Sequence, residues 1–333
     1  MNTRSDQMTA FLAGTEWADA NLAALAGDAS ARRYVRLTRP NGETAVLMDA
    51  PPDTCGSQTA FLRVASHLRT VGLAAPDLIS ADAEAGFLLM EDFGDRSFAK
   101  EAGRSSTSES DLYALACDVL LHLNHAPPAW LDRPSADTLA DMTMIAFSHY
   151  AGLSPQEDGP KRFLAAFKDA LVPVTSSPPV LVLRDYHAEN LIWRPEQTGL
   201  AQAGLLDFQD ALSGPAVYDL VSLLQDARRD LQDGLEEGMI ERYIVRSGVD
   251  PTAFRHDYHV IGVQRHLRIL GVFARLSLEM KKPNYVDFIP RTWRHLQRAL
   301  DHPGLDHIAQ MLSDLLPEPT ASHLSTLRAK ADG

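Results

Sequence analysis

Hard oxygen donors alternate with short apolar runs between residues 179 and 208, and this pattern restricts the fold of the segment. The donors Asp185, Asn190 and Asp207 stand at the ends of the runs. Two carboxylates and an amide in such places are costly to bury unless they are paired or bind a cation. The runs are typical of short buried strands and lie at 181–183, 191–193 and 203–206.

This arrangement suits phosphoryl transfer, which needs positioning and charge neutralisation more than covalent chemistry. In that interpretation Asp185 is the carboxylate beside the attacking hydroxyl, and Asn190 and Asp207 are hard oxygen ligands for Mg²⁺. Alone, the pair Asp185 and Asn190 is equally typical of a turn between strands, so the prediction depends on the apolar flanks.

Length and composition indicate a two-lobed globular protein. A chain of 333 residues exceeds the usual size of one domain, and 45% hydrophobic with 23% charged residues is ordinary. No apolar run reaches the roughly 18–20 residues that span a bilayer, and the N-terminal segment lacks an apolar signal core. Two cysteines, Cys55 and Cys117, favour a reducing, cytoplasmic location, and no cysteine spacing indicates zinc.

The formal net charge of −13 disfavours nucleic acid and anionic membrane as partners. Solubility explains this charge better than attraction of a cationic substrate does, because whole-chain charge says nothing about the charge inside one cleft. The oligomeric state stays open at this point.

The first 90 residues are predicted to form a small β-sheet with one helix beside it. Pro40-Asn41-Gly42 between two β-like runs is a strong hairpin signal. The helix at 57–71 has one apolar face and stops at Gly72. The other elements expected here are a short amphipathic helix at 8–26 and strands at 35–39, 44–49, 78–80 and 87–90.

Beyond Glu91 the pattern becomes mainly helical. A capping box at Ser108–Asp111 begins a helix that runs to about Asn124, and the last dozen residues look frayed. Further helices are expected at 160–172, 215–231, 234–246, 251–280, 291–300 and 305–315. The predicted fold class is α+β, with a β-rich N-terminal lobe (1–92), a hinge at about 90–95, and a larger, mainly helical C-terminal lobe (96–333).

Four motifs together carry a family resemblance. They are RDYHAEN at 184–190 as a catalytic loop, LDFQD at 206–210 as a metal-binding segment, PAVYDL at 215–220 as the next helix start, and LLMEDFGD at 88–95 as a hinge. With them the chain resembles the aminoglycoside phosphotransferase/choline kinase family, relatives of the eukaryotic protein kinases, from about residue 20 to 300. The resemblance implies a bilobal protein-kinase-like fold with ATP between the lobes. It implies a catalytic base at Asp185, Mg²⁺ ligands at Asn190 and Asp207, and an adenine site at the backbone of Met90, Glu91 and Phe93.

Further motifs resemble one group within that family, the bacterial anomeric kinases of N-acetylmuramate and N-acetylglucosamine. They are GDASARRY at 27–34, MDAPP at 48–52, DFQDALSGPAVYDLVSLL at 207–224 and QRHLRILGVFARL at 264–276. The implied reaction adds phosphate to the anomeric hydroxyl of a cell-wall amino sugar, yielding a sugar 1-phosphate for recycling.

The chain departs from the general kinase pattern at the phosphate-binding ion pair. Met48 stands where most relatives carry a strand lysine, and the helix at 57–71 contains no glutamate. The absence of both the lysine and the glutamate is self-consistent, because either one alone would be a buried charge without a partner, which is costly. Arg32 and Arg33 are the candidate replacements, since planar guanidinium groups match phosphate oxygens. Backbone N–H groups around Gly27 and Ser30 are further candidates for phosphate contact.

The acceptor site is less clearly marked. Asp219, at the start of a predicted helix, is expected to support the catalytic loop by accepting backbone N–H groups. Tyr186 either stacks on a sugar or packs in the core, and His187 and His266 are interpreted as structural. The residues considered for acceptor contact are Arg184, Tyr186, His187, Gln209 and Asp210, with the helix face of Gln264, Arg265, His266 and Arg268.

Three other functions remain to be separated from an amino-sugar kinase. An antibiotic or choline-type kinase would need an acidic acceptor pocket, whereas residues 251–300 are rich in Arg and His. A nucleotide-binding pseudokinase fits Met48 but not the retained Asp185, Asn190 and Asp207. A protein kinase is disfavoured because Pro215 opens a helix almost directly after the metal-binding segment.

Overall fold

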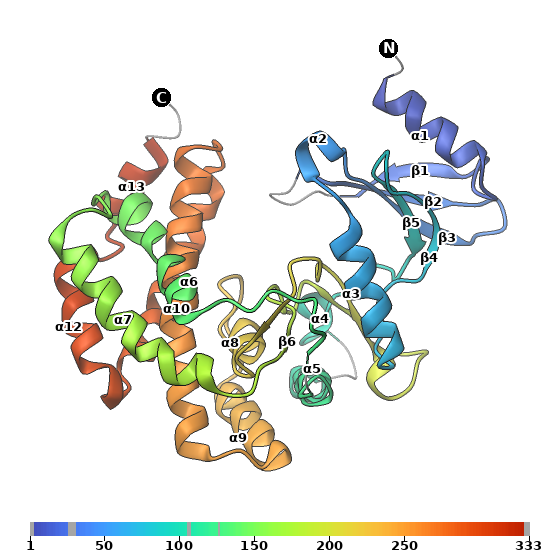
Figure 1. Cartoon of the computed structure of the whole chain (residues 1–333). Coiled ribbons are helices and arrows are strands. Elements are labelled where there is room, and N and C mark those ends of the chain that lie inside the picture. The colour runs from blue at the N-terminus through green and yellow to red at the C-terminus, as the bar shows by residue number, and fades with distance from the viewer. Residues whose placement is uncertain (1–2, 26–30, 105–107, 126, 330–333) are drawn as a thin grey trace. The chain divides into compact units, whose positions relative to one another are not determined.

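The computed structural model describes residues 3–25, 31–104, 108–125 and 127–329 of a chain that divides into two compact units. Unit 1 comprises Met1–Ser108 and Glu189–Asp210, and unit 2 comprises Glu109–Ala188 and Ala211–Gly333. Unit 1 contains an antiparallel sheet and unit 2 is mostly helical, as the predicted bilobal kinase-like fold requires (Figure 1).

The sheet of unit 1 has five strands in the order β1-β2-β3-β5-β4, all paired antiparallel. The predicted β2–β3 hairpin is confirmed, with Tyr34 opposite Met48 and a left-handed Gly42 (φ 89°) in its turn. The strands are β1 (Asn21–Ala24), β2 (Arg33–Thr38), β3 (Thr44–Asp49), β4 (Leu78–Asp82) and β5 (Phe87–Glu91).

The two faces of this sheet have different neighbours because side chains alternate along a strand. One face buries Leu37, Leu47 and Leu89 in a core that Leu12 of α1 (Arg4–Ala13) and Trp17 complete. Residues of the opposite face line the cavity of unit 1.

The N-terminal helix is shorter than predicted. It was expected over 8–26, but α1 ends at Ala13, with Gly14 as its cap, and β1 pairs with β2. The segment Asn21–Ala24 has good helix formers, so its pairing with a neighbouring strand has overridden local propensity.

The boundary between the units also differs from the predicted one at 92–96. The β7–β8 hairpin joins unit 1 because its backbone bonds to that unit. Leu205 N–H donates to the Ala74 carbonyl and Trp193 N–H to the Arg96 carbonyl, both at 2.7 Å. The other elements of unit 1 are α2 (Pro52–Cys55), α3 (Thr59–Thr70), α4 (Phe98–Glu101), β7 (Leu191–Trp193), η2 (Gly199–Gln202) and β8 (Ala203–Leu205).

Unit 2 is built around α10 (Pro251–Leu278), the long orange helix in Figure 1, which packs against α7, α8, α11 and α13. Most predicted helices are present, but α6, η1 and α13 were not predicted, and α13 corrects the expectation of a frayed C-terminus over its length. No helix of the described residues is long and apolar enough to cross a membrane. The other elements are α5 (Glu109–His122), α6 (Ala136–Asp141), η1 (Ala146–Ala151), α7 (Asp158–Ser176), β6 (Val180–Val182), β9 (Leu212–Gly214), α8 (Tyr218–Leu224), α9 (Leu235–Ser247), η3 (Pro283–Phe288), α11 (Ile289–Leu300), η4 (Pro303–Leu305), α12 (Asp306–Leu315) and α13 (Ala321–Ala329).

Gly271 allows α10 to approach η1 closely. A Cβ at this position would lie 2.3 Å from the carbonyl carbon of Ile145 and 2.5 Å from the Ala146 nitrogen. We predict that Gly271→Ala lowers the free energy of unfolding by about 1–3 kcal/mol, because backbone must move to admit the methyl group. The matched control is Gly238→Ala in α9, where no atom lies within 4 Å of the added Cβ, and which should stabilise by roughly 0.5–1 kcal/mol. Urea unfolding of both variants, followed by circular dichroism, checks this; equal shifts in the same direction would contradict it.

Candidate active site

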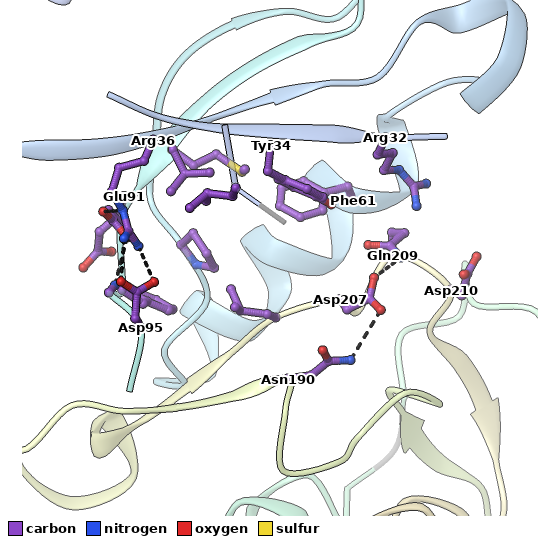
Figure 2. A pocket seen from close by; sticks show the side chains of 18 residues that line it. Arg32, Tyr34, Arg36, Phe61, Glu91, Asp95, Asn190, Asp207, Gln209 and Asp210 are labelled. Atoms are coloured by element: carbon purple, nitrogen blue, oxygen red, sulfur yellow. Dashed lines mark hydrogen bonds and ion pairs between the residues drawn. The ribbon is translucent and has the colours of Figure 1, made fainter. Parts of the chain in front are cut away.

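A cavity of about 520 Å³ lies within unit 1 and is lined by strands β2, β3 and β5, α3 and the segment after β8. Figure 2 shows two polar ends. Asn190, Asp207 and Asp210 gather with Arg32 at one end, and Arg36 meets Asp95 at the other. Apolar side chains, among them Val46, Phe61 and Met90, line the space as well. This combination of an apolar body and charged ends suits a ligand with a flat apolar part and a charged part.

Two amides hold the Asp207 carboxylate at the first end. Asn190 Nδ2 donates to one carboxylate oxygen at 3.3 Å and Gln209 Nε2 to the other at 2.8 Å (Figure 2). The hairpin brings these residues together, since Leu206 N–H donates to the Asn190 carbonyl at 3.0 Å. Asp207 itself has φ 59°, a left-handed conformation that is uncommon outside glycine and frequent at functional sites.

The donor set at this end fits Mg²⁺ in the presence of phosphate. Asn190 and Asp207 offer an amide and a carboxylate oxygen, and Asp210 lies nearby. Across the described residues, no three His, Cys, Asp or Glu side chains form a metal-holding group. Mg²⁺ is usually bound by one or two carboxylates with water and substrate phosphates, so two protein ligands suffice for it.

The other end of the cavity is tied by ion pairs around the predicted hinge. Arg36 bridges Asp92 (2.6 Å) and Asp95 (2.7 Å), and Arg194 pairs with Glu91 at 2.8 Å. The Arg194 guanidinium also lies 4.1 Å above the Phe93 ring. These contacts restrain the hinge, and Met90, Glu91 and Phe93 line the cavity.

Strand alternation separates the two candidate phosphate cations. Arg32, Tyr34 and Arg36 line the cavity, two residues apart, whereas Arg33 is exposed and absent from the lining. Arg33 therefore lies on the wrong side of the strand for phosphate contact, which corrects its prediction. Gly27 and Ser30 lie outside the described residues. Met48 is fully buried on β3 and leaves no cation at the usual lysine position.

The cavity also changes the chemistry of Tyr34. Burial raises the pKa of its phenol to about 12, and the nearby Asp207 carboxylate adds to the effect. Tyr34 thus stays a neutral hydroxyl at physiological pH. Neither Tyr34 nor Arg36 was named from the sequence, although their period-two spacing from Arg32 could have indicated both.

In unit 2 the loop that was predicted to be catalytic is anchored by α8 and α10. The Asp219 carboxylate accepts the N–H groups of Leu183 (2.6 Å) and Arg184 (2.9 Å), as expected from the sequence. The Arg184 carbonyl in turn accepts from Ser222 Oγ (3.1 Å) and Arg265 Nη1 (3.0 Å), contacts that the sequence did not reveal. Arg184 has φ 71°. The backbone immediately before Asp185 is therefore held from several sides.

Asp219 is buried with no ion pair in the described part of the chain. Burial raises the pKa of its carboxyl to about 7, and the two backbone N–H donors act in the opposite direction. These donors favour the charged form of the carboxyl, so its charge and the shape of the loop depend on each other.

Two predicted acceptor residues are buried in unit 2. Tyr186 is 2% exposed and its hydroxyl donates to the Ala116 carbonyl at 2.9 Å, so it packs rather than stacks on a ligand. His187 is also buried, and burial lowers its pKa to about 4. Gln209 is buried too, with its amide nitrogen bonded to Asp207. This burial favours packing for Tyr186 and agrees with the structural interpretation of His187, and it argues against both as acceptor contacts. Gln209 also lines the cavity of unit 1, where its amide positions Asp207.

A second cavity of about 520 Å³ lies within unit 2 among α9, α10 and α11. Its polar side chains form a network centred on Glu236, which accepts from Gln225 (2.8 Å), Tyr258 (3.0 Å) and Arg298 (2.8 Å). His295, which lines the cavity, is stacked on His266. Burial lowers the pKa of His295 to about 4 and that of His266 well below its usual value.

A nucleotide-sized cavity beside an Asn–Asp pair, in a bilobal kinase-like fold, defines a phosphotransferase. The sequence matches the phosphotransferase enzyme family over residues 21–255, and the chain belongs to this family. It is a small-molecule kinase, an enzyme that transfers a phosphoryl group to a hydroxyl acceptor.

The relatives are similar over nearly the whole chain. An N-acetylmuramate/N-acetylglucosamine kinase of Caulobacter vibrioides is 34% identical, covering 95% of this chain and 98% of its own length. A choline/ethanolamine kinase family protein of Mesorhizobium loti has a similar structure, with a TM-score of 0.61, 14% identity, and coverage of 98% and 100%. An aminoglycoside phosphotransferase of Streptomyces rimosus, in complex with ADP and streptomycin, has a TM-score of 0.54, 17% identity, and coverage of 78% and 98%. At such low identity the two solved structures show the fold alone.

The anchor at Asp219 generates a prediction about turnover. Its two oxygens each accept a different backbone N–H, so Asp219→Asn leaves one N–H facing an amide NH₂ instead of an acceptor. We expect kcat to fall at least about tenfold, since a small displacement of a catalytic group is costly. Asp314→Asn, an exposed aspartate in α12, is the matched control. Steady-state kinetics of both variants check this, and unchanged kcat in Asp219→Asn would refute the anchoring role.

The buried histidines of unit 2 generate a prediction about pH. Burial lowers the pKa of His187, His259 and His295 to about 4, whereas the unfolded chain binds these protons near pH 6.5. The unfolded state therefore holds more protons between these values, and stability present above pH 6.5 is lost as the pH falls towards 4. The urea midpoint should be lower at pH 5.0 than at pH 7.5. His295→Gln should shrink the difference between the two pH values, whereas the exposed His307→Gln should not.

Proposed function

We propose that the chain transfers the terminal phosphoryl group of ATP to the anomeric hydroxyl of N-acetylmuramate or N-acetylglucosamine. The observation that carries this proposal is the 34% identity to a kinase of these sugars over 95% of the chain. The product is a sugar 1-phosphate, suited to cell-wall recycling. Such a reaction belongs where ATP is supplied, so the proposed location is cytoplasmic.

The cavity of unit 1 is the proposed nucleotide site. The adenine lies against the hinge at Met90, Glu91 and Phe93, where backbone groups are held by the flanking ion pairs. Arg32 neutralises phosphate charge at the opposite end, in place of the strand lysine that Met48 replaces. A planar guanidinium is matched to phosphate oxygens and remains charged at any physiological pH.

Mg²⁺, when bound, neutralises phosphate charge and aligns the transferring group. Asn190 and Asp207 are the proposed ligands, and Gln209 keeps the Asp207 carboxylate oriented through its amide. Since Gln209 donates to one oxygen of Asp207, the side chain cannot rotate freely. The proposed role of these residues is to hold the ion at one fixed place.

Asp185 is the proposed general base of the reaction. Its backbone is fixed by the bonds that Asp219, Ser222 and Arg265 make to the preceding residues. Positioning matters more than basicity here, because the transition state of phosphoryl transfer is loose and has little bonding to the nucleophile. In this mechanism Asp185 orients the sugar hydroxyl and accepts its proton as the new P–O bond forms and the bond from the γ-phosphorus to the departing ADP breaks.

Removal of the base tests the proposal. We predict that Asp185→Asn lowers kcat with N-acetylmuramate and N-acetylglucosamine by roughly 10²–10⁴-fold with little change in the KM for ATP. Asp169→Asn, an exposed aspartate in α7, is the matched control and should retain wild-type kinetics. A coupled ADP-release assay with Mg·ATP measures both.

The acceptor profile separates the alternative functions. Wild-type turnover of choline or streptomycin, but of neither sugar, would replace the amino-sugar proposal with a choline or antibiotic kinase. Mg·ATP binding without turnover of any acceptor would indicate a nucleotide-binding pseudokinase. Phosphate release from the product under mild acid distinguishes an anomeric phosphate from a phosphate on another hydroxyl.

A further inference from the structure

A half-buried cation on α10 has no partner in the described structure. Arg268 is partly exposed, and across the described residues no side chain or carbonyl accepts a hydrogen bond from it or pairs with it. Neighbouring arginines of unit 2 behave differently. Arg255 pairs with Glu237 (2.5 Å), and Arg298 with Glu236 (2.8 Å). Arg268 is therefore a distinct case among the packed cations of this helical region.

The position of Arg268 is set by the face of α10 on which it lies. Arg265, three residues earlier on the same face, donates to the Arg184 carbonyl at 3.0 Å and lies 5.7 Å from the centre of the Tyr218 ring. Arg268 lies one turn further along α10 on nearly the same face. Burial lowers the pKa of Arg268, as do the charges of Arg184 and Arg265, whereas Tyr218 and Asp185 act in the opposite direction. Arg268 is thus within electrostatic reach of the proposed base.

A half-buried arginine with no counter-ion favours the binding of an anion. Taking a cation partly out of water without a counter-ion is unfavourable, so a bound negative group would recover the loss. The guanidinium presents a planar fork that matches a carboxylate through two parallel bonds. None of its nitrogens is fully enclosed, because Arg268 is missing from the buried polar atoms that lack a partner. Part of the side chain is therefore open to a molecule the size of water.

We propose that Arg268 binds the carboxylate of an acidic amino-sugar acceptor and makes the enzyme favour N-acetylmuramate over N-acetylglucosamine. This inference rests on the proposed function. The two sugars differ in the lactyl ether that only N-acetylmuramate carries, and its carboxylate is the acceptor's sole charge. The nucleotide phosphates have a separate candidate cation, Arg32, in the cavity of unit 1. An anion held near Asp185 by α10 therefore belongs to the acceptor.

The test compares acceptors in two matched variants. Arg268→Gln should lower kcat/KM for N-acetylmuramate by about 10–100-fold, the value of a charge-assisted bond, and change it less than about threefold for N-acetylglucosamine. Arg268→Lys should lose part of this, because it keeps the charge but not the fork. Arg275→Gln, the same substitution at an exposed site two turns further along α10, should change neither value.

Other outcomes overturn the inference. Equal losses with both sugars would mean that Arg268 acts on a group common to both, and unchanged kinetics with both would mean that it contacts no substrate. Wild-type protein that phosphorylates neither sugar refutes the proposed function instead. In that event D-lactate, which carries the same carboxylate, remains the probe: it should raise the Tm of wild type and Arg275→Gln but not of Arg268→Gln, and an equal shift in all three would refute the carboxylate site.

Discussion

The two hydrogen bonds that Asp219 accepts from the backbone of Leu183 and Arg184 hold the loop on which the proposed chemistry depends. Burial of this carboxyl is opposed by the two backbone N–H donors and by the positive charge of Arg265. The carbonyl of Arg184 is tied in turn to α8 and α10. The backbone immediately before Asp185 is therefore fixed by hydrogen bonds to side chains of α8 and α10.

In unit 1 the main feature is a cavity whose charged side chains are held in fixed positions at its two ends. Alternation along β2 sends Leu37 into the core and Arg36 to the cavity. Aspartates fix the Arg36 guanidinium at one end of the cavity, and amides fix Asp207 at the opposite end. A cavity with fixed charges at both ends is pre-organised for an elongated anionic ligand, because the protein has already met the cost of ordering these side chains.

Much of this could be predicted from the sequence, and the misses have physical causes. The β2–β3 hairpin, the helix α3 and most helices of unit 2 follow from turn chemistry and periodicity, which act locally. The segment Asn21–Ala24 was expected to be helical, but it pairs with β2. Likewise Tyr186 and His187 flank the proposed base in sequence yet point into the core. Residues next to a functional residue in the sequence lie on the same loop, but their side chains can point in other directions.

The sequence by itself determined the family and the proposed site residues, because Asp185, Asn190 and Asp207 carry their chemistry in their side chains and their spacing is local. Only the tertiary structure decided which neighbours serve them. It assigned Arg32 rather than Arg33 to the cavity, since one residue along a strand reverses the face. It also brought Asp219, Ser222 and Arg265 to one loop from distant positions, and among the described residues it gave Arg268 no partner, because such contacts depend on packing over long sequence separations.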